Sequence, residues 1–396
     1  MTSVGPTLDD DCDEKIVATM LELPAAFVDF LNEHEIDPHV YDVDPSAMPR
    51  YFRTKDESVT KEELRKHFDQ VERVPWLRCF YAISSSVSLA TSELYVGGKI
   101  YGMEASSGFA VTVLDPQPGD HVLDLCCAPG AKLTMLADVL QKQGSITGVD
   151  FSKSRIAACR TLVHKYDLIH SPAASWRCRL FHADGRTFDV RPESNDTISA
   201  LETILDSAEV AQRSQKTQTR KRMNKSARAR LAKQAKDAVV ALGSSVDSSA
   251  LYDKVLVDAE CTHDGSLRHL TKLKSDDEWT QYLTKYLNRE HVQGILDLQH
   301  DLIRNGFRLL REGGRMVYST CSLSRKQNEE IVASFLKDTP TAELVPFDTT
   351  GIPHQPGHLD HTIRFTPLEN MGGLFVSLIT KKPSVKRIKL SNADDV

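Results

Sequence analysis

The 396-residue sequence lacks a run of about 18 apolar residues, the length that a membrane-spanning helix needs. It also lacks an apolar or Arg-rich targeting segment near its start, where five of the six residues from Asp9 to Glu14 are acidic. The eight cysteines include no Cys-x-x-Cys pair, which argues against a zinc ribbon and favours reduced thiols. These absences predict a nuclear or cytoplasmic protein that makes no membrane contact and holds no metal.

Positive charge is concentrated in one segment, although the net charge is −6. Residues 213–236 contain ten Lys or Arg and no acid, and such a run repels itself and rarely packs. It predicts either an insertion that adds phosphate contacts for RNA or a linker that its charge keeps soluble. Both interpretations stay open. A second basic stretch, Lys381–Lys389, is typical of a nuclear-import signal on a disordered tail.

The run Val122–Lys132 predicts a strand, a tight turn and the start of a helix. Val122–Leu125 favours β structure, Ala128–Gly130 turns the chain, and apolar residues at helical spacing follow from Leu133. A strand, glycine turn and helix of this kind present backbone N–H groups at the carboxyl edge of a sheet, where α/β proteins bind cofactors. A plain strand, turn and helix with no ligand is the alternative.

A second predicted strand, Ser145–Asp150, ends in an acid 20 residues beyond Gly130. At this spacing a carboxylate meets the ribose hydroxyls of a nucleotide cofactor. The glycine pattern is not G-x-G-x-x-G, so a nucleoside cofactor without a pyrophosphate is favoured over a dinucleotide. S-adenosylmethionine fits best.

The hydrophobic pattern divides the chain into four parts. Residues 1–45 predict a helical segment with a helix over 15–45, and residues 46–104 predict a small α+β domain. Residues 105–382 alternate strand and helix, which predicts a doubly wound Rossmann-like α/β sheet, and residues 383–396 predict a basic, disordered tail. In the small domain, strands are expected at 77–83 and 94–96 and a helix at 61–68.

The large sheet is expected to have strands at 121–127, 145–151, 179–184, 252–259 and 314–320. Helices are expected after the first three strands, and a longer helix over 291–310. Residues 187–251 predict a basic insertion, because roughly 60 residues is far beyond an ordinary connection.

Two of these strands run into cysteine, at Cys261 and Cys321. In a doubly wound sheet the carboxyl ends of such strands lie in the cofactor crevice. One cysteine there would fit a small buried hydrophobe. Two of them, on strands that should flank the cofactor, favour a chemical role for the thiols.

The motifs of this chain resemble those of the Sun/Nop-type (RsmB-like) RNA cytosine-5 methyltransferases. The resemblance covers roughly residues 46–382 and rests on the following segments: Asp124–Lys132, Asp258–Gly265, Tyr318–Ser322, Asn328–Glu330, Gln117–Gly119, Ser106–Ser107, Pro49–Arg53, Arg364, Pro367 and Gly373–Phe375. It implies methyl transfer from S-adenosylmethionine to a cytosine in tRNA or rRNA. The thiolate of Cys321 would add to carbon 6 of the base, and Cys261 would assist release of the methylated product.

The resemblance also implies roles for residues around the cofactor. Asp258 would stabilise protonation at nitrogen 3 of the base, Asp150 would hold the ribose hydroxyls, and Asp184 would lie on the adenine side. The remaining cofactor residues would be the following: Cys126, Cys127, Ala128, Pro129, Gly130, Ala131, Lys132 and Arg155. A monomer is expected. No metal site is expected at His354, His358 and His361, because they lie on a Pro/Gly loop without partner cysteines.

The chain departs from the family pattern around Cys261. The family has Pro before this cysteine and a Ser-Gly-x-Gly turn after it, whereas this chain has Glu260 and Thr262–Gly265. A nearby carboxylate should raise the pKa of the Cys261 thiol. His263 could offset that effect or carry a proton, or both residues could simply line an altered base pocket. The alternative function is therefore a catalytically impaired RNA-binding or scaffold protein of the same fold. A DNA methyltransferase is disfavoured because the chain has no Pro-Cys nucleophile motif, and a protein methyltransferase because paired strand-end cysteines have no use in protein N-methylation.

Overall fold

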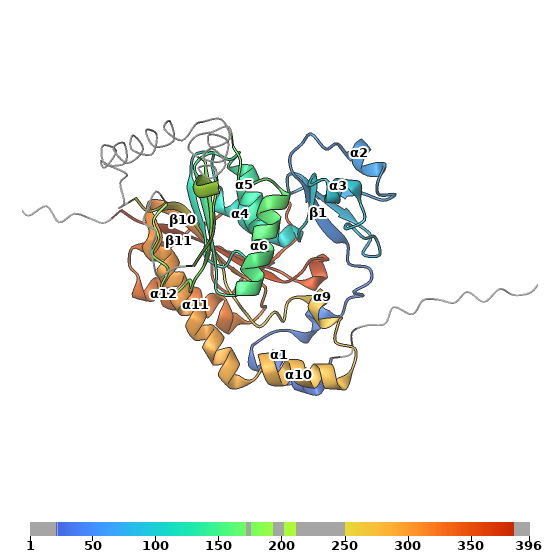
Figure 1. The fold of residues 1–396 in the computed structure, drawn as a ribbon. Coiled ribbons are helices and arrows are strands. Elements are labelled where there is room, and N and C mark those ends of the chain that lie inside the picture. Colours follow the sequence, from blue (N-terminus) through green and yellow to red (C-terminus); the bar gives the residue numbers. More distant parts are fainter. Residues whose placement is uncertain (1–20, 22, 172–175, 193–201, 211–249, 384–396) are drawn as a thin grey trace, which may run out of the picture.

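The computed structural model describes residues 21, 23–171, 176–192, 202–210 and 250–383. They form a small sheet and a large sheet (Figure 1). The small sheet is antiparallel in the order β2-β3-β1-β4, with strands β1 (Arg50–Thr54), β2 (Glu72–Arg73), β3 (Phe80–Ile83) and β4 (Ile100–Gly102). It lies within residues 46–104, but the exact domain boundaries stay a prediction.

One predicted strand of the small domain is wrong. Residues 94–96 belong to a single helical turn, α3 (Glu93–Val96), because the Ser92 side chain accepts a hydrogen bond from the Leu94 N–H (3.2 Å) and starts a helix. The predicted helix over 61–68 is present but shorter, as α2 (Lys61–Arg65).

The large sheet has ten strands in the order β12-β13-β14-β10-β9-β5-β6-β7-β8, with β11 paired to β14. Its strands are β5 (His121–Asp124), β6 (Ser145–Asp150), β7 (Arg177–His182), β8 (Glu202–Asp206), β9 (Tyr252–Asp258), β10 (Leu310–Thr320), β11 (Ala342–Leu344), β12 (Gln355–Pro356), β13 (Thr362–Phe365) and β14 (Leu374–Lys381). The five strands predicted for this sheet are β5, β6, β7, β9 and β10, and they run parallel to one another.

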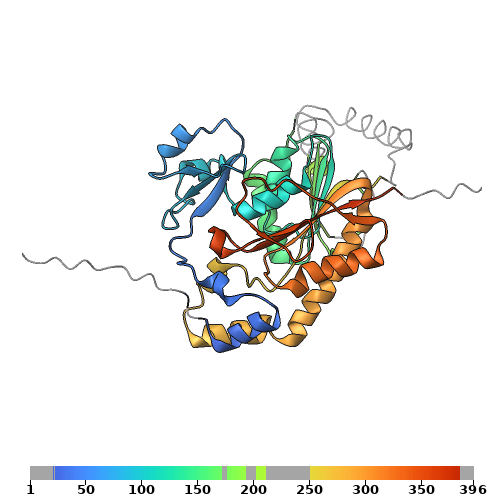
Figure 2. The same ribbon diagram turned by 180° about the vertical axis from the view of Figure 1, so that it is seen from behind.

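Helices cover both faces of the large sheet, which confirms the predicted doubly wound architecture (Figures 1 and 2). Apolar side chains of α4 (Ala105–Leu114), α5 (Ala131–Val139) and α6 (Lys153–Lys165) pack in one core cluster. Those of α11 (Arg289–Leu309) and α12 (Glu329–Asp338) pack in a second cluster on the other face. The strand order reverses between β5 and β9, and ligands bind at such a point in open α/β sheets.

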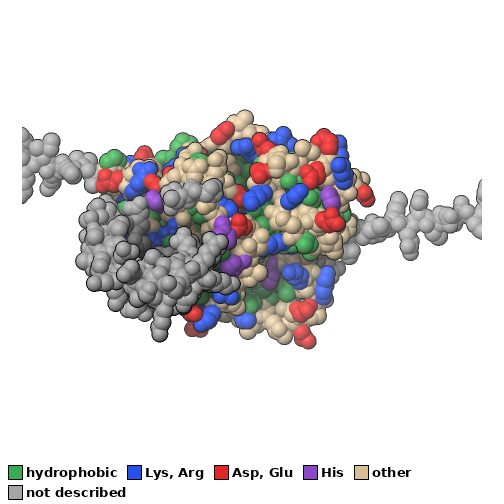
Figure 3. Space-filling view, turned by 45° about the horizontal axis from the view of Figure 1, so that its top comes forward, with side chains coloured by type: hydrophobic (Ala, Val, Ile, Leu, Met, Phe, Trp, Pro, Cys, Tyr) green, Lys and Arg blue, Asp and Glu red, His purple; other side chains and the backbone are tan. Residues whose placement is uncertain are grey.

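Two predictions about the connection after β7 need correction. The described residues between β7 and β8, 183–192, contain no helix. Part of the predicted insertion belongs to the sheet, because β8 pairs antiparallel with β7 at its edge. The basic run 213–236 lies outside the described residues, and on the face drawn in Figure 3 basic and acidic side chains are interspersed.

The predicted helix over 15–45 is present only as α1 (Ala25–Glu33), followed by the 3-10 turn η1 (Pro38–Tyr41), while residues 15–20 lie outside the described part. Figures 1 and 2 show α1 beside α10 (Asp276–Tyr286), where the Phe27 ring lies 5.3 Å from that of Trp279. The N-terminal segment is thus attached to the helical layer that follows the Cys261 loop.

The C-terminal strands were not predicted, and the first lysine of the second basic stretch belongs to one of them. Lys381 ends β14, and its Nζ donates hydrogen bonds to the carbonyls of Phe307 and Leu310 (both 2.8 Å). The remaining short elements are α9 (Leu267–Leu270), η2 (Arg325–Gln327) and η3 (Pro367–Glu369). None of the described helices has the length and apolar character to cross a membrane.

Candidate active site

A cavity of about 900 Å³ opens at the carboxyl ends of the parallel strands. This volume is within the range of roughly 300–1,000 Å³ that is typical of small-ligand pockets. Strand-end residues from β5, β6, β9 and β10 line it, including Cys126, Asp150, Asp258 and Cys321. The sheet therefore brings together residues that are nearly 200 positions apart in the sequence.

The turn after β5 has the backbone geometry of a cofactor cradle. Gly130 precedes α5 with a φ of 113°, and a Cβ at this position would lie 3.0 Å from the Cys159 Sγ. The backbone conformation therefore favours glycine, and the tight space beside Cys159 adds to this preference. The Ala128 N–H donates to the Asp150 Oδ2 (3.2 Å), and Arg155 Nη2 donates to the Ala128 carbonyl (2.6 Å). Two residues predicted for the cofactor pocket thus fix the turn.

The predicted cofactor residues fall into two groups. Those that line the cavity are Cys126, Ala128, Lys132, Asp150, Arg155, Asp184 and Asp258. Those that shape the turn without lining the cavity are Cys127, Pro129, Gly130 and Ala131. Cys127 is buried in the core, with its Sγ 4.0 Å from the Sγ of Cys159, so its contribution is packing.

Phe151 was missed by the sequence analysis. It follows Asp150 directly, lines the cavity and is 74% exposed, although large apolar side chains are usually buried. An aromatic residue immediately after a strand-end acid is the signal that would have identified it. Across the cavity, the Asp184 carboxylate is bound by the Arg186 guanidinium (2.7 Å), which lowers the pKa of Asp184.

Lys132 and Asp258 form an ion pair between the two sides of the cavity. The Lys132 Nζ lies 2.6 Å from the Asp258 Oδ2 and donates to the Ser107 Oγ (3.3 Å). The Ser319 Oγ donates to the other oxygen of Asp258 (2.7 Å). Behind this pair, burial and the Asp258 charge raise the pKa of Asp124 to about 8. The site therefore holds one carboxylate in an ion pair and a second, deeper carboxyl group whose neutral form is favoured by burial and by the Asp258 charge.

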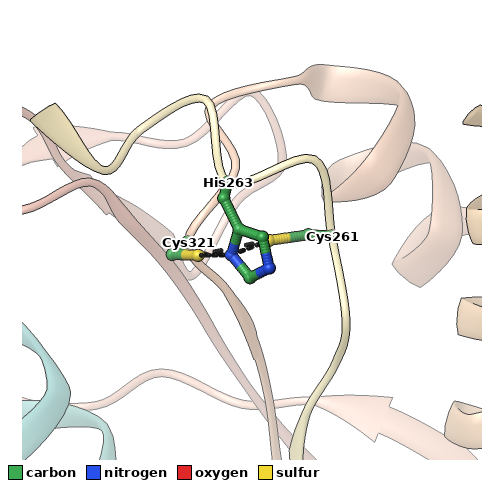
Figure 4. Close-up of side chains that lie close together, drawn as sticks. All are labelled: Cys261, His263 and Cys321. Atoms are coloured by element: carbon green, nitrogen blue, oxygen red, sulfur yellow. Dashed lines mark hydrogen bonds between the residues drawn. The ribbon is translucent and has the colours of Figure 1, made fainter. Parts of the chain in front are cut away.

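The two predicted cysteines lie in contact with one imidazole. The Sγ atoms of Cys261 and Cys321 are 3.3 Å apart, and the His263 Nδ1 lies 2.9 Å from the Cys321 Sγ and 3.8 Å from the Cys261 Sγ. Figure 4 shows the three side chains pointing toward one another from two loops. Their donor atoms all lie within 4.8 Å of one another, so a thiophilic metal could also use them.

Within this trio, His263 and Cys321 each shift the pKa of the other. The hydrogen bond to Cys321 raises the pKa of His263 to about 9. The neighbouring Cys261 thiol and burial raise the pKa of Cys321 above its ordinary value, and the imidazole of His263 lowers it. In this environment the imidazole is the group that favours ionisation of the Cys321 thiol.

A buried polar network, also missed by the sequence analysis, holds the two thiol loops against each other. Asp264 is fully buried, and its carboxylate accepts hydrogen bonds from the Leu323 N–H (2.7 Å) and the Thr262 hydroxyl. The Gln327 side chain accepts from the Thr262 N–H (3.1 Å) and donates to the Thr262 hydroxyl (2.8 Å). The Gly265 N–H donates to the Cys321 carbonyl (3.1 Å). These contacts fix the positions of both thiols.

Other segments of the family pattern support the same loops. The Arg364 guanidinium pairs with the Glu329 carboxylate through two hydrogen bonds, and it donates to the Leu323 carbonyl (2.8 Å). The Gly373 N–H donates to the Gly265 carbonyl (2.8 Å). These far-separated motifs therefore meet around the loop that carries Cys321.

The sequence of this chain matches the model of a known protein family. The model of the family described as "16S rRNA methyltransferase RsmB/F" matches residues 111–194 and 196–380. The chain is 24% identical over 256 residues to the probable ribosomal RNA small subunit methyltransferase B of Bacillus subtilis. It is 26% identical over 326 residues to the ribosomal RNA small subunit methyltransferase F of Vibrio cholerae, and 27% identical over 279 residues to the tRNA (cytosine(34)-C(5))-methyltransferase of Drosophila melanogaster.

These alignments cover 65%, 80% and 66% of this chain, but 41%, 53% and 28% of the relatives. The chain thus spans about half or less of the length of the curated relatives that it matches. Among solved structures, a methyltransferase homologue from Pyrococcus horikoshii is similar with a TM-score of 0.57 and 20% identity, over 91% of this chain and 100% of the other. NSun6 from the same organism, crystallised with SFG, has a TM-score of 0.56 and 16% identity over 85% and 91% of the two chains.

Proposed function

Because the chain belongs to the family of the 16S rRNA methyltransferases RsmB/F, we propose that it methylates carbon 5 of a cytosine in rRNA or tRNA, with S-adenosylmethionine as the methyl donor. The observation that carries the proposal is the pair of thiols at the strand ends. Cys321 lines the same cavity as Asp150. The Sγ atoms of Cys261 and Cys321 are 3.3 Å apart. Methyl transfer to carbon 5 needs a thiol of this kind, because carbon 5 of cytosine is a weak nucleophile on its own.

The residues of the cavity suit S-adenosylmethionine. The Asp150 carboxylate would accept hydrogen bonds from the ribose hydroxyls, the exposed Phe151 ring would stack on the adenine, and Arg155 would keep the turn in shape. S-adenosylmethionine contains no pyrophosphate, so this turn can bind it without a G-x-G-x-x-G pattern. When bound, the cofactor supplies a methyl group on a positively charged sulfur, which is a strong electrophile.

The chain's own residues activate the base. The Cys321 thiolate would add to carbon 6, which makes carbon 5 nucleophilic, and Cys261 would assist release of the product. Asp258 would stabilise the proton at nitrogen 3. A carboxylate has about four acceptor sites, so Asp258 can accept a further hydrogen bond while Lys132 and Ser319 hold it.

Covalent trapping tests this proposal. The protein is incubated with S-adenosylmethionine and with rRNA and tRNA transcripts in which 5-fluorocytidine replaces cytidine. Fluorine at carbon 5 cannot leave as a proton does, so the thiol should stay bonded to the base and give a complex that survives denaturing electrophoresis. We expect such a complex with the wild type and with Cys261→Ser, and none with Cys321→Ser.

The alternative function predicts a different result. A catalytically impaired scaffold would bind the same transcripts in a filter assay without any denaturation-resistant complex. That outcome would end the proposal of a methyltransferase. Nuclear or cytoplasmic localisation and a monomeric state remain predictions from the sequence.

A further inference from the structure

We propose that His263 is a catalytic residue of this site, the base that takes the proton of Cys321 when the thiol adds to carbon 6 and returns it when the thiol leaves. This inference rests on the proposed function, since it names a further group in the same reaction. The experiment below separates the two, because one of its measurements needs neither RNA nor methyl transfer.

The geometry of the trio supports a proton transfer. The His263 Nδ1 lies 2.9 Å from the Cys321 Sγ, and the ring of this exposed residue points toward both thiols (Figure 4). A nucleophile and a base within hydrogen-bond distance are the arrangement that activates a thiol. To accept the proton at Nδ1, the neutral imidazole carries its own hydrogen on Nε2.

The backbone at this position supports the same role. His263 has a φ of 56°, in the left-handed region that favours glycine. Its neighbours Thr262 and Asp264 are buried and tied to the Cys321 loop, so the surrounding structure holds the strained residue in place. Non-glycine residues in strained conformations cluster at functional sites. Here the conformation directs the imidazole toward Cys321.

The surroundings explain why Cys321 needs a base. The Cys261 thiol and burial both favour the protonated form of Cys321, and the imidazole opposes them. The other titratable groups that face the imidazole are Glu260 and Asp264, which stabilise its protonated form, and His269, whose ring lies 6.5 Å away. The net environment therefore favours the neutral thiol, and the imidazole 2.9 Å away is the contact that can take its proton when sulfur attacks carbon 6.

The proposed steps balance. The Cys321 S–H bond breaks and the proton moves to the His263 Nδ1, while the sulfur forms a bond to carbon 6. Carbon 5 takes the methyl group, and the sulfonium leaves as a neutral thioether. Carbon 5 then loses its proton to solvent water, the electron pair of that C–H bond re-forms the double bond between carbons 5 and 6, the bond between sulfur and carbon 6 breaks, and the departing thiolate takes the proton back from the imidazolium. No oxidant, reductant or further reactant is needed.

The first test measures thiol reactivity alone. Wild type and His263→Gln are treated with iodoacetamide between pH 5 and 9 in the presence of EDTA, and modification of Cys321 is followed by peptide mass spectrometry. Because only the thiolate reacts, the variant should react at least about tenfold more slowly at pH 7, with its midpoint at higher pH. His269→Gln, a nearby histidine that does not touch a thiol, should match the wild type. EDTA removes any metal held by the trio, which would slow alkylation of the wild type and hide the expected difference. Overlapping profiles of His263→Gln and wild type would refute the proposal.

The second test measures methyl transfer. Loss of a general base costs roughly 10²–10⁴-fold, so His263→Gln should lose kcat at pH 7 with KM for RNA little changed, and the loss should shrink as pH rises. His263→Gly, which suits the left-handed backbone, should show the same loss with an unchanged or higher melting temperature. If the wild type methylates and both variants match it, the proposal fails. If the wild type does not methylate but the alkylation shift is seen, the thiol–imidazole pair stands and the proposed function fails.

Discussion

The two halves of the cavity are built in different ways. The cofactor half is local, since the Ala128 N–H donates to Asp150 and the Ala128 carbonyl accepts from Arg155, and these pairs are 22 and 27 positions apart. The thiol half joins loops about 60 positions apart, through buried side chains such as Asp264 and Gln327. Backbone shape therefore creates the first half, and a satisfied polar network creates the second. Changes in one half should leave the function of the other half intact.

The largest effect is expected for Cys321→Ala. Without the nucleophile, methyl transfer should fall to background, a loss of at least about 10³-fold. Affinity for S-adenosylmethionine, measured by calorimetry, should stay within about threefold, because the thiol acts on the base. The matched control is Cys79→Ala in the loop before β3, which is not part of the lining of this cavity and should retain both properties. Near-normal turnover of Cys321→Ala would mean that the thiol half is not needed for methyl transfer, and the proposed division of roles between the two halves would be wrong.

The same difference explains how much could be predicted from the sequence. The turn at Gly130 and the acid at Asp150 were predictable because each follows from a short run of residues, and the five parallel strands from their apolar patterns. Strand β8 was missed because a long polar connection hides a short edge strand. The contact of His263 with Cys321 depends on a left-handed residue and a buried network between distant loops, and no local pattern encodes either of them.

A smaller effect, in the opposite half, is expected for Asp150→Ala. Hydrogen bonds to charged groups contribute roughly 1.5–3 kcal/mol, so affinity for S-adenosylmethionine should fall by about 10- to 100-fold in calorimetry. The pH profile of Cys321 alkylation should not change. The control is Asp167→Ala, an exposed acid paired with His170, which should bind the cofactor normally. A shifted Cys321 profile in Asp150→Ala would show that the halves are coupled.

At Asp124, which lies where the two halves meet, no effect on the reaction itself is expected, only an effect on the pH dependence of stability. Its carboxyl is buried at the end of β5, accepts from the Cys126 N–H (3.4 Å), and feels the charge of Asp258. The folded protein keeps a proton on Asp124 up to a pKa of about 8, whereas the unfolded chain loses it near pH 4. Folding therefore takes up a proton between these values, and the free energy of unfolding should fall as pH rises, by at most about 1.4 kcal/mol per pH unit from this group.

Asp124→Asn keeps the acceptor for the Cys126 N–H but cannot ionise. Its free energy of unfolding, measured in urea at pH 6, 7 and 8, should decline less steeply than that of the wild type, so the variant gains relative stability as pH rises. The gain should level off above pH 8, where the folded wild type has also lost the proton. Parallel curves would mean that Asp124 is already ionised in the folded protein beside Asp258. In that case the two halves would share a second buried charge, and the Lys132 ammonium would have to balance both carboxylates.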